Sequence, residues 1–308
     1  MKISEEIFKK YLKAGKSVAK TLNLAKKIAK PGAKFLEVAN TLEENIINDG
    51  CGLAFPINMS LNELAAHYSP IIDDPSIIPE KGLLKIDCGA HFDGYIADAA
   101  ITINLGNDPG IYQKIVDASE EALKKTLGYC RPGVDVIDIG HIIYKTIKQY
   151  ELKPISNLGG HGLEQYNLHA GVFIPNTPSM GTSYKLEEGK VYACEPFVTN
   201  GFGQVDNGPQ ITIFQIKSTK IKNINLMDKT LLNKFKEKFK TLPFSPRAID
   251  FIEPKNQISN IVNKFHKMGI LFGYNVFIEI GKGLVSQSEH TFIVDKDRPI
   301  ITTNQEMD

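Results

Sequence analysis

Acidic residues inside apolar strands are the first sign of chemistry in this sequence. Residues 85–103, KIDCGAHFDGYIADAAITI, alternate like a β-hairpin, yet Asp87 and Asp98 interrupt its apolar arms. Asp93-Gly94 is typical of a two-residue type I′ turn, which places Gly89 opposite Asp98. Asp87 then shares a face with Asp98, with backbones about 7–8 Å apart, and both carboxylates can reach one small cation. The alternative, in which one aspartate caps a loop and the other is solvated, is equally compatible with this hairpin alone.

A sequence repeat predicts a second hairpin of the same kind. KPGAKFLEVANTL, from Lys30, and RPGVDVIDIGHII, from Arg131, match apolar to apolar, and each follows an amphipathic helix. The expected buried faces are Tyr11, Ala14, Val18, Leu22 and Ala25 in the first helix, and Ile111, Ile115, Ala118, Ala122 and Thr126 in the second. His67 and His169 hold nearly the same place in the two halves, as do Asp87 and Glu195. Amphipathic helices resemble one another by chance, but Pro-Gly, His and buried acid in one order favour a repeated unit.

The second hairpin is predicted to be split by an insertion. KVYACEPF, with Glu195, supplies one arm, and GLVSQSEHTFIV, with Glu289, supplies the other. The insertion, 217–274, is expected to be helical, and the rest of the chain (1–216 and 275–308) carries the paired hairpins. DKTLLNKFKEKFK presents Leu231, Leu232, Phe235 and Phe239 on one side and lysines on the other. FSPRAIDFI predicts a further helix with Ser245 as N-cap and Pro246 in its first turn. The lysine-rich face could contact RNA, but such a face is more often simply solvated, and we favour that interpretation.

Four acids on paired hairpins point to divalent metal. Asp87, Asp98, Glu195 and Glu289 would repel one another strongly in a core, and two divalent cations would neutralise them. His161, between two glycines, is a plausible fifth donor, although a lone histidine is more often a core or loop residue. Oxygen donors with one imidazole suit Mn, Fe, Co or Zn. Cys88 and Cys194 adjoin two of the acids but point to the opposite face of their strands, so we expect them in the core.

The expected chemistry is hydrolysis. A pair of divalent cations activates water and polarises a carbonyl group. His67 and His169, one from each half, are free to hydrogen-bond the substrate carbonyl and the tetrahedral intermediate.

Composition limits the class of protein. The chain has 308 residues, 42% of them hydrophobic, and a net charge of +1, which gives no overall attraction to nucleic acid or membranes. No apolar run is long enough to span a bilayer, and MKISEEIFKK lacks the apolar segment of a signal peptide. The cysteines, Cys51, Cys88, Cys130 and Cys194, show no CxxC spacing. We therefore expect a reduced, cytoplasmic protein with no membrane and no specific nucleic-acid partner.

Five segments carry a family resemblance. AFPINMSLNELAAHYSP, KIDCGAHFDGYIADAA, NLGGHGLEQYNLHAG, CEPFVTNGFGQV and SEHTFIV resemble successive motifs of the methionine aminopeptidases, across essentially the whole chain. The order Asp, Asp, His, Glu, Glu is shared with the wider pita-bread (M24) family, including aminopeptidase P and prolidase. The first segment and the insertion resemble type II methionine aminopeptidases, and the short N-terminus resembles the archaeal form. The resemblance implies an α+β pita-bread fold of two quasi-equivalent helix-helix-hairpin halves. It also implies that 1–216 and 275–308 form the catalytic domain and that 217–274 is a winged-helix-like helical insertion.

The same resemblance implies individual roles. Asp87 holds mainly one metal, Asp98 and Glu289 bridge both, and His161 and Glu195 complete the other site, with Glu195 as proton acceptor. His67 and His169 contact the substrate, and the methionine pocket is lined by Phe55, Leu168 and Tyr274. The implied partners are the N-termini of nascent polypeptides and, as a further candidate, the ribosome, and the implied state is a monomer.

The sequence differs from the family pattern at two positions, and two other functions are also compatible with it. Ser288 stands where an aromatic residue usually precedes Glu-His-Thr, which leaves the packing beside Glu289 open, and Cys194 replaces an aliphatic residue. A prolidase or Xaa-Pro aminopeptidase is one alternative, although a dipeptidase must hold a substrate carboxylate, a task suited to arginine, and the chain has three arginines. A non-catalytic pita-bread binding domain is the other, although such a domain should lose ligands, and all five are present.

Overall fold

Two helix pairs open the two halves of the fold. In the computed structural model, which describes residues 3–217 and 224–304, α1 (Glu5–Ile28) and α2 (Phe35–Asn48) open the first half, and α3 (Ile111–Tyr129) and α4 (Val136–Gln149) open the second. The turns between paired helices correspond: the backbone N–H of Gly32 donates to Ile78 at 2.9 Å, and that of Gly133 donates to Leu186 at 2.8 Å. The repeat predicted from the two Pro-Gly segments is therefore present in the fold.

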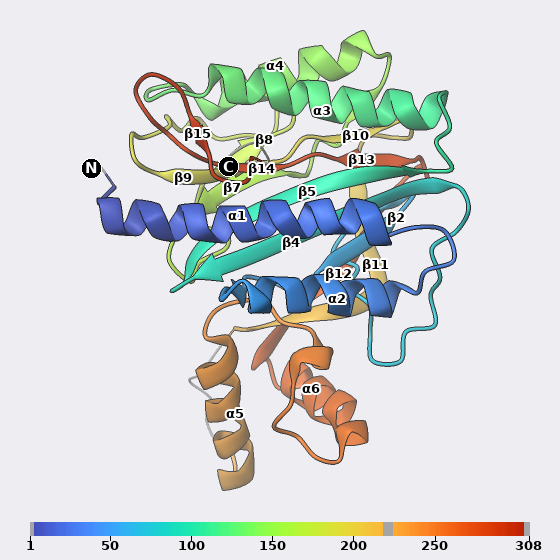
Figure 1. The fold of residues 1–308 in the computed structure, drawn as a ribbon, viewed down its shortest axis with the longest axis vertical. Helices are drawn as coiled ribbons and strands as arrows, with labels where there is room; N and C mark the ends of the chain where they lie inside the picture. Colours follow the sequence, from blue (N-terminus) through green and yellow to red (C-terminus); the bar gives the residue numbers. More distant parts are fainter. Residues whose placement is uncertain (1–2, 218–223, 305–308) are drawn as a thin grey trace.

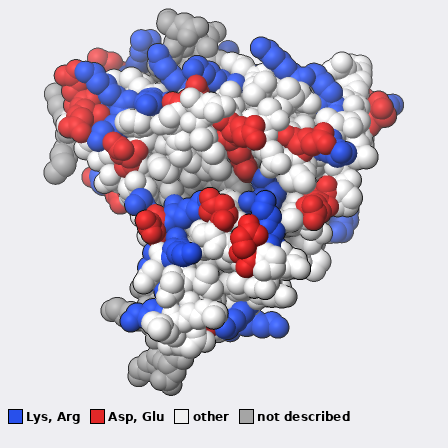
Figure 2. Space-filling model, turned by 60° about the horizontal axis from the view of Figure 1, so that its bottom comes forward, with Lys and Arg blue, Asp and Glu red and all other residues white. Residues whose placement is uncertain are grey.

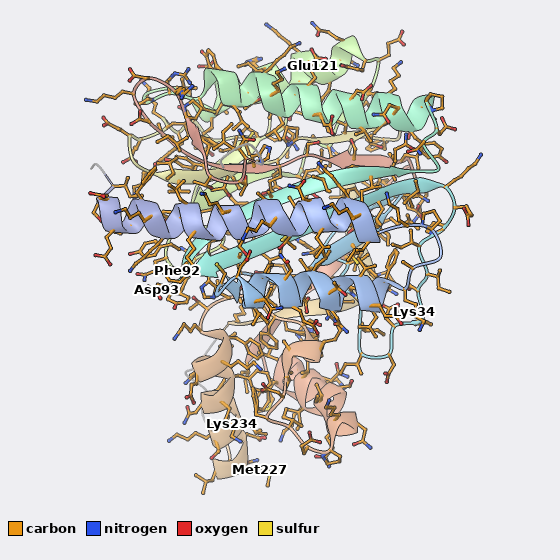
Figure 3. All side chains as sticks on the ribbon, in the orientation of Figure 1. Lys34, Phe92, Asp93, Glu121, Met227 and Lys234 are labelled. Atoms are coloured by element: carbon orange, nitrogen blue, oxygen red, sulfur yellow. The ribbon has the colours of Figure 1, made fainter. Side chains whose placement is uncertain are left out.

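The first hairpin has the predicted turn and register. Strands β4 (Gly82–Phe92) and β5 (Tyr95–Leu105) are antiparallel, with Gly89 opposite Asp98 and Phe92 opposite Tyr95. Asp93 and Gly94 have φ angles of 52° and 85°, as a type I′ turn requires. Phe92 and Asp93 lie at the tip of this hairpin (Figure 3).

The second hairpin is present but interrupted on both arms. Strand β9 (Val191–Cys194) pairs with β14 (His290–Ile293), and β10 (Phe197–Thr199) pairs with β13 (Val285–Gln287). The ladder breaks at Glu195-Pro196 on one arm and Ser288-Glu289 on the other, since proline cannot donate to it. Both predicted acids therefore lie at the break.

The remaining strands complete four sheets. They are β1 (Gly52–Leu53), β2 (Asn58–Leu61), β3 (Leu64–Ala66), β6 (Lys153–Pro154), β7 (Gly159–Leu163), β8 (Phe173–Pro175), β11 (Val205–Ile216), β12 (Leu271–Glu279) and β15 (Ile300–Ile301). The sheet orders are β1-β4-β2 with β5 on β4, β13-β10-β6, β11-β12-β3, and β15-β14-β9-β7-β8.

Helices cover the sheets from outside. Figure 1 shows α1 lying along β4 and β5, with α3 and α4 covering the second half. Cys88 and Cys194 are fully buried, one in each half's core, as their strand positions predict. The predicted faces of α1 and α3 are buried with one exception. Ile111, the first residue of α3, is 42% exposed.

The insertion is a helical unit with its own core. Helices α5 (Leu226–Phe239) and α6 (Ile258–Lys267) project from the body below α2 (Figure 1). Leu232, Phe235 and Phe239 are buried as predicted, and Leu231 is partly buried. Two one-turn 3₁₀ helices, η1 (Pro246–Ala248) and η2 (Lys255–Gln257), lie between α5 and α6.

The helix predicted at Ser245 is wrong beyond its first turn. Ser245 Oγ accepts a hydrogen bond from the backbone N–H of Arg247, so the capping signal acts, but the chain forms only η1. The helix ends there because Ile249 has an extended backbone, with φ of -86° and ψ of 108°, and Ile249 and Ile252 both enter the insertion core. The predicted insertion boundary at residue 274 falls inside β12, and its residues 218–223 lie outside the described part of the chain.

The visible surface carries mixed charge. On the face in Figure 2, lysine and arginine alternate with aspartate and glutamate, so this face has no extended field of one sign. Met227 and Lys234 point outward from α5 (Figure 3), consistent with a solvated lysine face. Among the described residues, no helix is long and apolar enough to cross a bilayer.

Candidate functional site

The two hairpins and one further strand bring the five predicted ligands together. Asp87 and Asp98 come from β4 and β5, Glu195 and Glu289 from the interruptions of the second hairpin, and His161 from β7. His161 Nε2 lies 3.7 Å from Asp98 Oδ2 and 3.7 Å from Glu195 Oε1. One potential ligand atom from each of Asp98, His161 and Glu289 lies within 4.8 Å of the others.

Backbone contacts between the hairpins fix this arrangement. The backbone N–H of Asp98 donates to Thr291 Oγ1, which in turn donates to the Asp98 carbonyl, both at 2.8 Å. The N–H of Glu289 donates to the carbonyl of Ala100 at 3.0 Å. On the opposite side, a Cβ at Gly160 would lie 2.2 Å from the carbonyl oxygen of Ala193, so only glycine lets β7 bring His161 this close.

The carboxylate oxygens of this cluster lack partners. Asp87 Oδ1, Asp98 Oδ1 and Glu289 Oε1 are buried and accept no hydrogen bond from the described residues. Burial raises the pKa of Asp87 to about 6. Burial and the neighbouring acids hold the pKa values of Asp98, Glu195 and Glu289 well above their usual range. Orphaned oxygens on mutually repelling acids are the donor set that divalent cations bind, so these residues fit a metal centre.

His161 is suited to complete that donor set. Its Nδ1 lies 3.3 Å from the carbonyl oxygen of Gly162, and burial, followed by the His169 ring, lowers its pKa to about 3. With Nδ1–H donated to Gly162, the neutral ring presents the Nε2 lone pair to the two carboxylates. Lone pairs facing one another at 3.7 Å favour a cation between them.

Gln287 is a residue of this site that the sequence reasoning missed. Its side-chain Nε2 donates to Asp87 Oδ2 at 3.2 Å, to Glu195 Oε2 at 3.3 Å and to Glu289 Oε2 at 3.2 Å. The side chain is 1% exposed. The period of a β-strand could have revealed it, because Gln287 lies two residues before Glu289 in a single predicted arm.

A cavity of about 390 Å³ opens onto the acids and is otherwise largely apolar. The predicted pocket residues Phe55, Leu168 and Tyr274 all line it. Further lining residues that the sequence analysis did not identify include Asn58, Phe197, Ile213, Pro243 and Phe277. Phe55 packs on the hairpin because a Cβ at Gly89 would lie 2.1 Å from its ring, so the glycine opposite Asp98 makes room for this wall.

His67 and His169 also line the cavity. The His67 ring lies 4.6 Å from Phe277, and the His169 ring lies 4.6 Å from His161, centroid to centroid. His67 has a left-handed backbone with φ of 67°, which is uncommon for a residue with a side chain. Thr212 Oγ1 donates to the His67 carbonyl at 3.1 Å and holds this conformation. Burial lowers the pKa of His67 to about 4, so the ring is a neutral hydrogen-bonding group.

The two departures from the family pattern are accommodated without loss of a ligand. Ser288 is 5% exposed, and its hydroxyl group lies 2.8 Å from that of Ser119 on α3. A pair of small hydroxyl side chains thus fills the place where an aromatic residue is usual. Cys194 is fully buried in the second core.

Comparisons with known proteins show the family from sequence and the fold from structure. Residues 9–224 match the model of metallopeptidase family M24. The chain is 42% identical over 295 residues to a methionine aminopeptidase of Pyrococcus abyssi, covering 96% of this chain and 98% of that one. A thermophilic Arx1 superposes with a TM-score of 0.85 at 19% identity, covering 97% and 91%. A prolidase from Pyrococcus furiosus superposes with a TM-score of 0.61 at 18% identity, covering 98% of this chain but 65% of that one.

Proposed function

The chain belongs to metallopeptidase family M24, and we propose that it is a methionine aminopeptidase that removes the initiator methionine from proteins and peptides. The observation that carries this proposal is the placement of the five-ligand cluster at one wall of an otherwise largely apolar cavity. Such a cavity holds an apolar first side chain while the peptide bond that follows it lies against the acids. The near full-length similarity to a methionine aminopeptidase supports the same assignment.

The acids and His161 are proposed to hold two divalent metal ions. Asp87 would bind mainly one ion, Asp98 and Glu289 would bridge both, and His161 with Glu195 would complete the second. When bound, such ions activate water and polarise the scissile carbonyl group. The buried oxygens of Asp87, Asp98 and Glu289 that lack hydrogen bonds support this assignment. Co, Mn, Fe and Zn all suit the donor set.

The side chains around the cluster are assigned by their position. Glu195, whose pKa is raised by burial and by Asp87, is proposed to take the proton of the attacking water and pass it to the leaving amine. His67 and His169 are proposed to donate hydrogen bonds to the substrate carbonyl and to the oxyanion that develops from it. Their place on the cavity wall beside the acids supports these roles.

The apolar part of the cavity is proposed to bind the methionine side chain. Phe55, Leu168 and Tyr274 line it together with Ile213 and Phe277. Burying a methionine side chain contributes about 1.5–3 kcal/mol relative to leaving it in water. The second residue would lie against His67 and the strand of His161, so a small side chain is expected there.

A prolidase is the weaker alternative. The prolidase comparison reaches 18% identity and covers 65% of that protein, against 42% and 98% for the methionine aminopeptidase. Neither Arg131, Arg247 nor Arg298 lines the cavity, so none is placed to bind the free carboxylate of a dipeptide. The five ligands, all retained and brought together, also argue against a non-catalytic binding domain.

The setting of the activity is part of the same proposal. We place the enzyme in the cytoplasm as a monomer acting on the N-termini of nascent polypeptides, with the ribosome as a further candidate partner. The nascent polypeptide is the expected substrate because the initiator methionine lies at the N-terminus of each new polypeptide as it is synthesised.

A peptide panel tests the function. Matched peptides beginning Met-Ala, Ala-Pro and Met-Lys are incubated with the metal-loaded chain, and free amino acids are measured. We expect rapid methionine release from Met-Ala alone. Faster cleavage of Ala-Pro would make the chain a prolidase, and no release from any peptide would favour the binding domain.

A further inference from the structure

Arg247 joins the insertion to the catalytic body through a buried fork of hydrogen bonds. Its Nη1 and Nη2 donate to Glu43 Oε2 and Oε1 at 3.0 and 2.8 Å, and Nη1 also donates to Asn40 Oδ1 at 2.7 Å. Both partners lie on α2, directly above the insertion in Figure 1. The side chains of Arg247 and Glu43 are 7% and 13% exposed. This is a bidentate, largely desolvated pair, unlike the exposed ion pairs that contribute little.

Glu43 in turn holds one wall of the substrate cavity. Its Oε1 accepts a hydrogen bond from the backbone N–H of Ile57 at 3.1 Å. Phe55 and Asn58, which flank Ile57, both line the cavity. The Glu43 carboxylate that Arg247 holds in place therefore also holds residues 55–58 in place.

Arg247 also holds the segment that carries His67. Its Nε donates to the Pro70 carbonyl at 2.6 Å, and Nη2 donates to Ser69 Oγ at 3.2 Å. The backbone N–H of Ser69 donates to Thr212 Oγ1 at 3.0 Å, the same hydroxyl that donates to the His67 carbonyl. Arg247 thus lies one step from the contact that keeps His67 in its left-handed conformation.

We propose that Arg247 is a positioning residue: the insertion acts as a brace that sets the Phe55 wall and the His67 backbone of the substrate cavity. Pro243, just before this contact, and Tyr274, at the end of the insertion on β12, line the same cavity. The brace gives the insertion a role in the reaction without contact between Arg247 and the substrate. The kinetic part of this inference rests on the proposed function.

Lysine cannot replace this side chain. Arginine offers five N–H donors in a rigid planar fork, and all five hydrogen bonds here end on four residues from two segments. A lysine ammonium is a point charge with three donors on a flexible stem. Arg247→Lys therefore keeps the charge and loses the geometry, whereas Arg247→Met removes both.

The experiment compares these variants with a control in the same insertion. Lys264 Nζ bonds both carboxylate oxygens of Asp228 at 2.7 Å, an ion pair with no contact to the cavity, so Lys264→Met is the matched control. Each metal-loaded chain is measured for methionine affinity by calorimetry, for kcat and KM, and for bound metal by elemental analysis. Hydrogen exchange of residues 53–70 is followed by mass spectrometry at a temperature where every variant is folded.

Both Arg247 variants should lose kcat/KM by about 10²-fold, as expected for a displacement of about 1 Å at the reacting groups. They should bind methionine more weakly, exchange residues 53–70 faster and keep wild-type metal content, while Lys264→Met changes none of these. Unchanged exchange of residues 53–70 in both Arg247 variants would overturn the brace, as would equal losses in Lys264→Met. If the wild type releases no methionine, the proposed function fails, and the exchange comparison still decides whether the brace exists.

Discussion

Replacing Gln287 by leucine should weaken metal binding without removing a ligand. The amide nitrogen of Gln287 donates to Asp87, Glu195 and Glu289, three of the four acids of the site. These hydrogen bonds turn the carboxylate groups toward a common centre. Leucine has a similar volume and no donor, so it leaves three buried carboxylates free to rotate apart.

The size of the effect follows from the number and length of these bonds. A hydrogen bond to a charged group contributes about 1.5–3 kcal/mol. The amide has two hydrogens for three acceptors at 3.2–3.3 Å, which is the long end of the hydrogen-bond range, so we expect the equivalent of one such bond. That predicts metal binding weaker by about 10–100-fold, which is also the usual effect of changing a partner of metal ligands.

The assay is competition between the protein and a chelator of known affinity, with metal content checked by elemental analysis. Gln149→Leu, at an exposed glutamine on α4, controls for the substitution itself. Activity at saturating metal should recover most of the loss in Gln287→Leu, because the five proposed ligands remain. Metal affinity within twofold of the wild type would refute the reasoning, since the three hydrogen bonds would then contribute nothing to the site.

Four further outcomes are expected. Asp98→Ala and Glu289→Ala should each lower methionine release by orders of magnitude and reduce bound metal, and full activity after exhaustive chelation, checked by elemental analysis, would contradict the metal assignment. His67→Ala and His169→Ala should lower kcat by about 10²–10³-fold with metal content unchanged, whereas metal loss in either variant would make that histidine a ligand. Release of methionine should be at least about 10²-fold slower for Met-Lys than for Met-Ala peptides, because a bulky second side chain displaces the scissile carbonyl; comparable rates would reject this crowding. The metal-free chain should lose thermal stability as the pH rises from 3.8, the ordinary pKa of Asp87, to about 6, because the folded state binds more protons than the unfolded state in this range. Added metal should restore the stability. A melting temperature that rises with pH through this range would contradict the raised pKa of Asp87.

Local rules were sufficient to predict the first hairpin and its acids. Asp93-Gly94 determines the turn type, and the turn type determines that Gly89 faces Asp98, so one dipeptide fixes the register of eleven-residue strands. The repeat extended this reasoning to the second half.

Contacts between segments far apart in the sequence could not be predicted from such local patterns. The signal at Ser245 and Pro246 is a true helix start, yet the chain becomes extended at Ile249 after one turn, where Ile249 and Ile252 pack into the insertion core. Arg247 bonds to residues more than 170 positions away, and no local pattern marks such a partner. Gln287 was detectable by strand period, but a lone amide in an apolar run suggests no chemistry until the three acids around it are placed.

The charge balance of the interior shows why the site needs a cation. Lys85 lies on β4 two residues before Asp87 and is 1% exposed, so it is a buried lysine on the same face of the strand as that acid. Its ammonium nevertheless donates to the carbonyls of Asn62 and Val285 at 2.8 and 2.9 Å, and not to the acids. Among the described residues, no lysine or arginine forms an ion pair with Asp87, Asp98, Glu195 or Glu289. Protons or bound cations must therefore neutralise these four carboxylates. Burial is the largest cause that raises their pKa values, and neighbouring acids raise those of Asp98, Glu195 and Glu289 further. At neutral pH a bound divalent metal ion would remove the repulsion that protonation removes in acid.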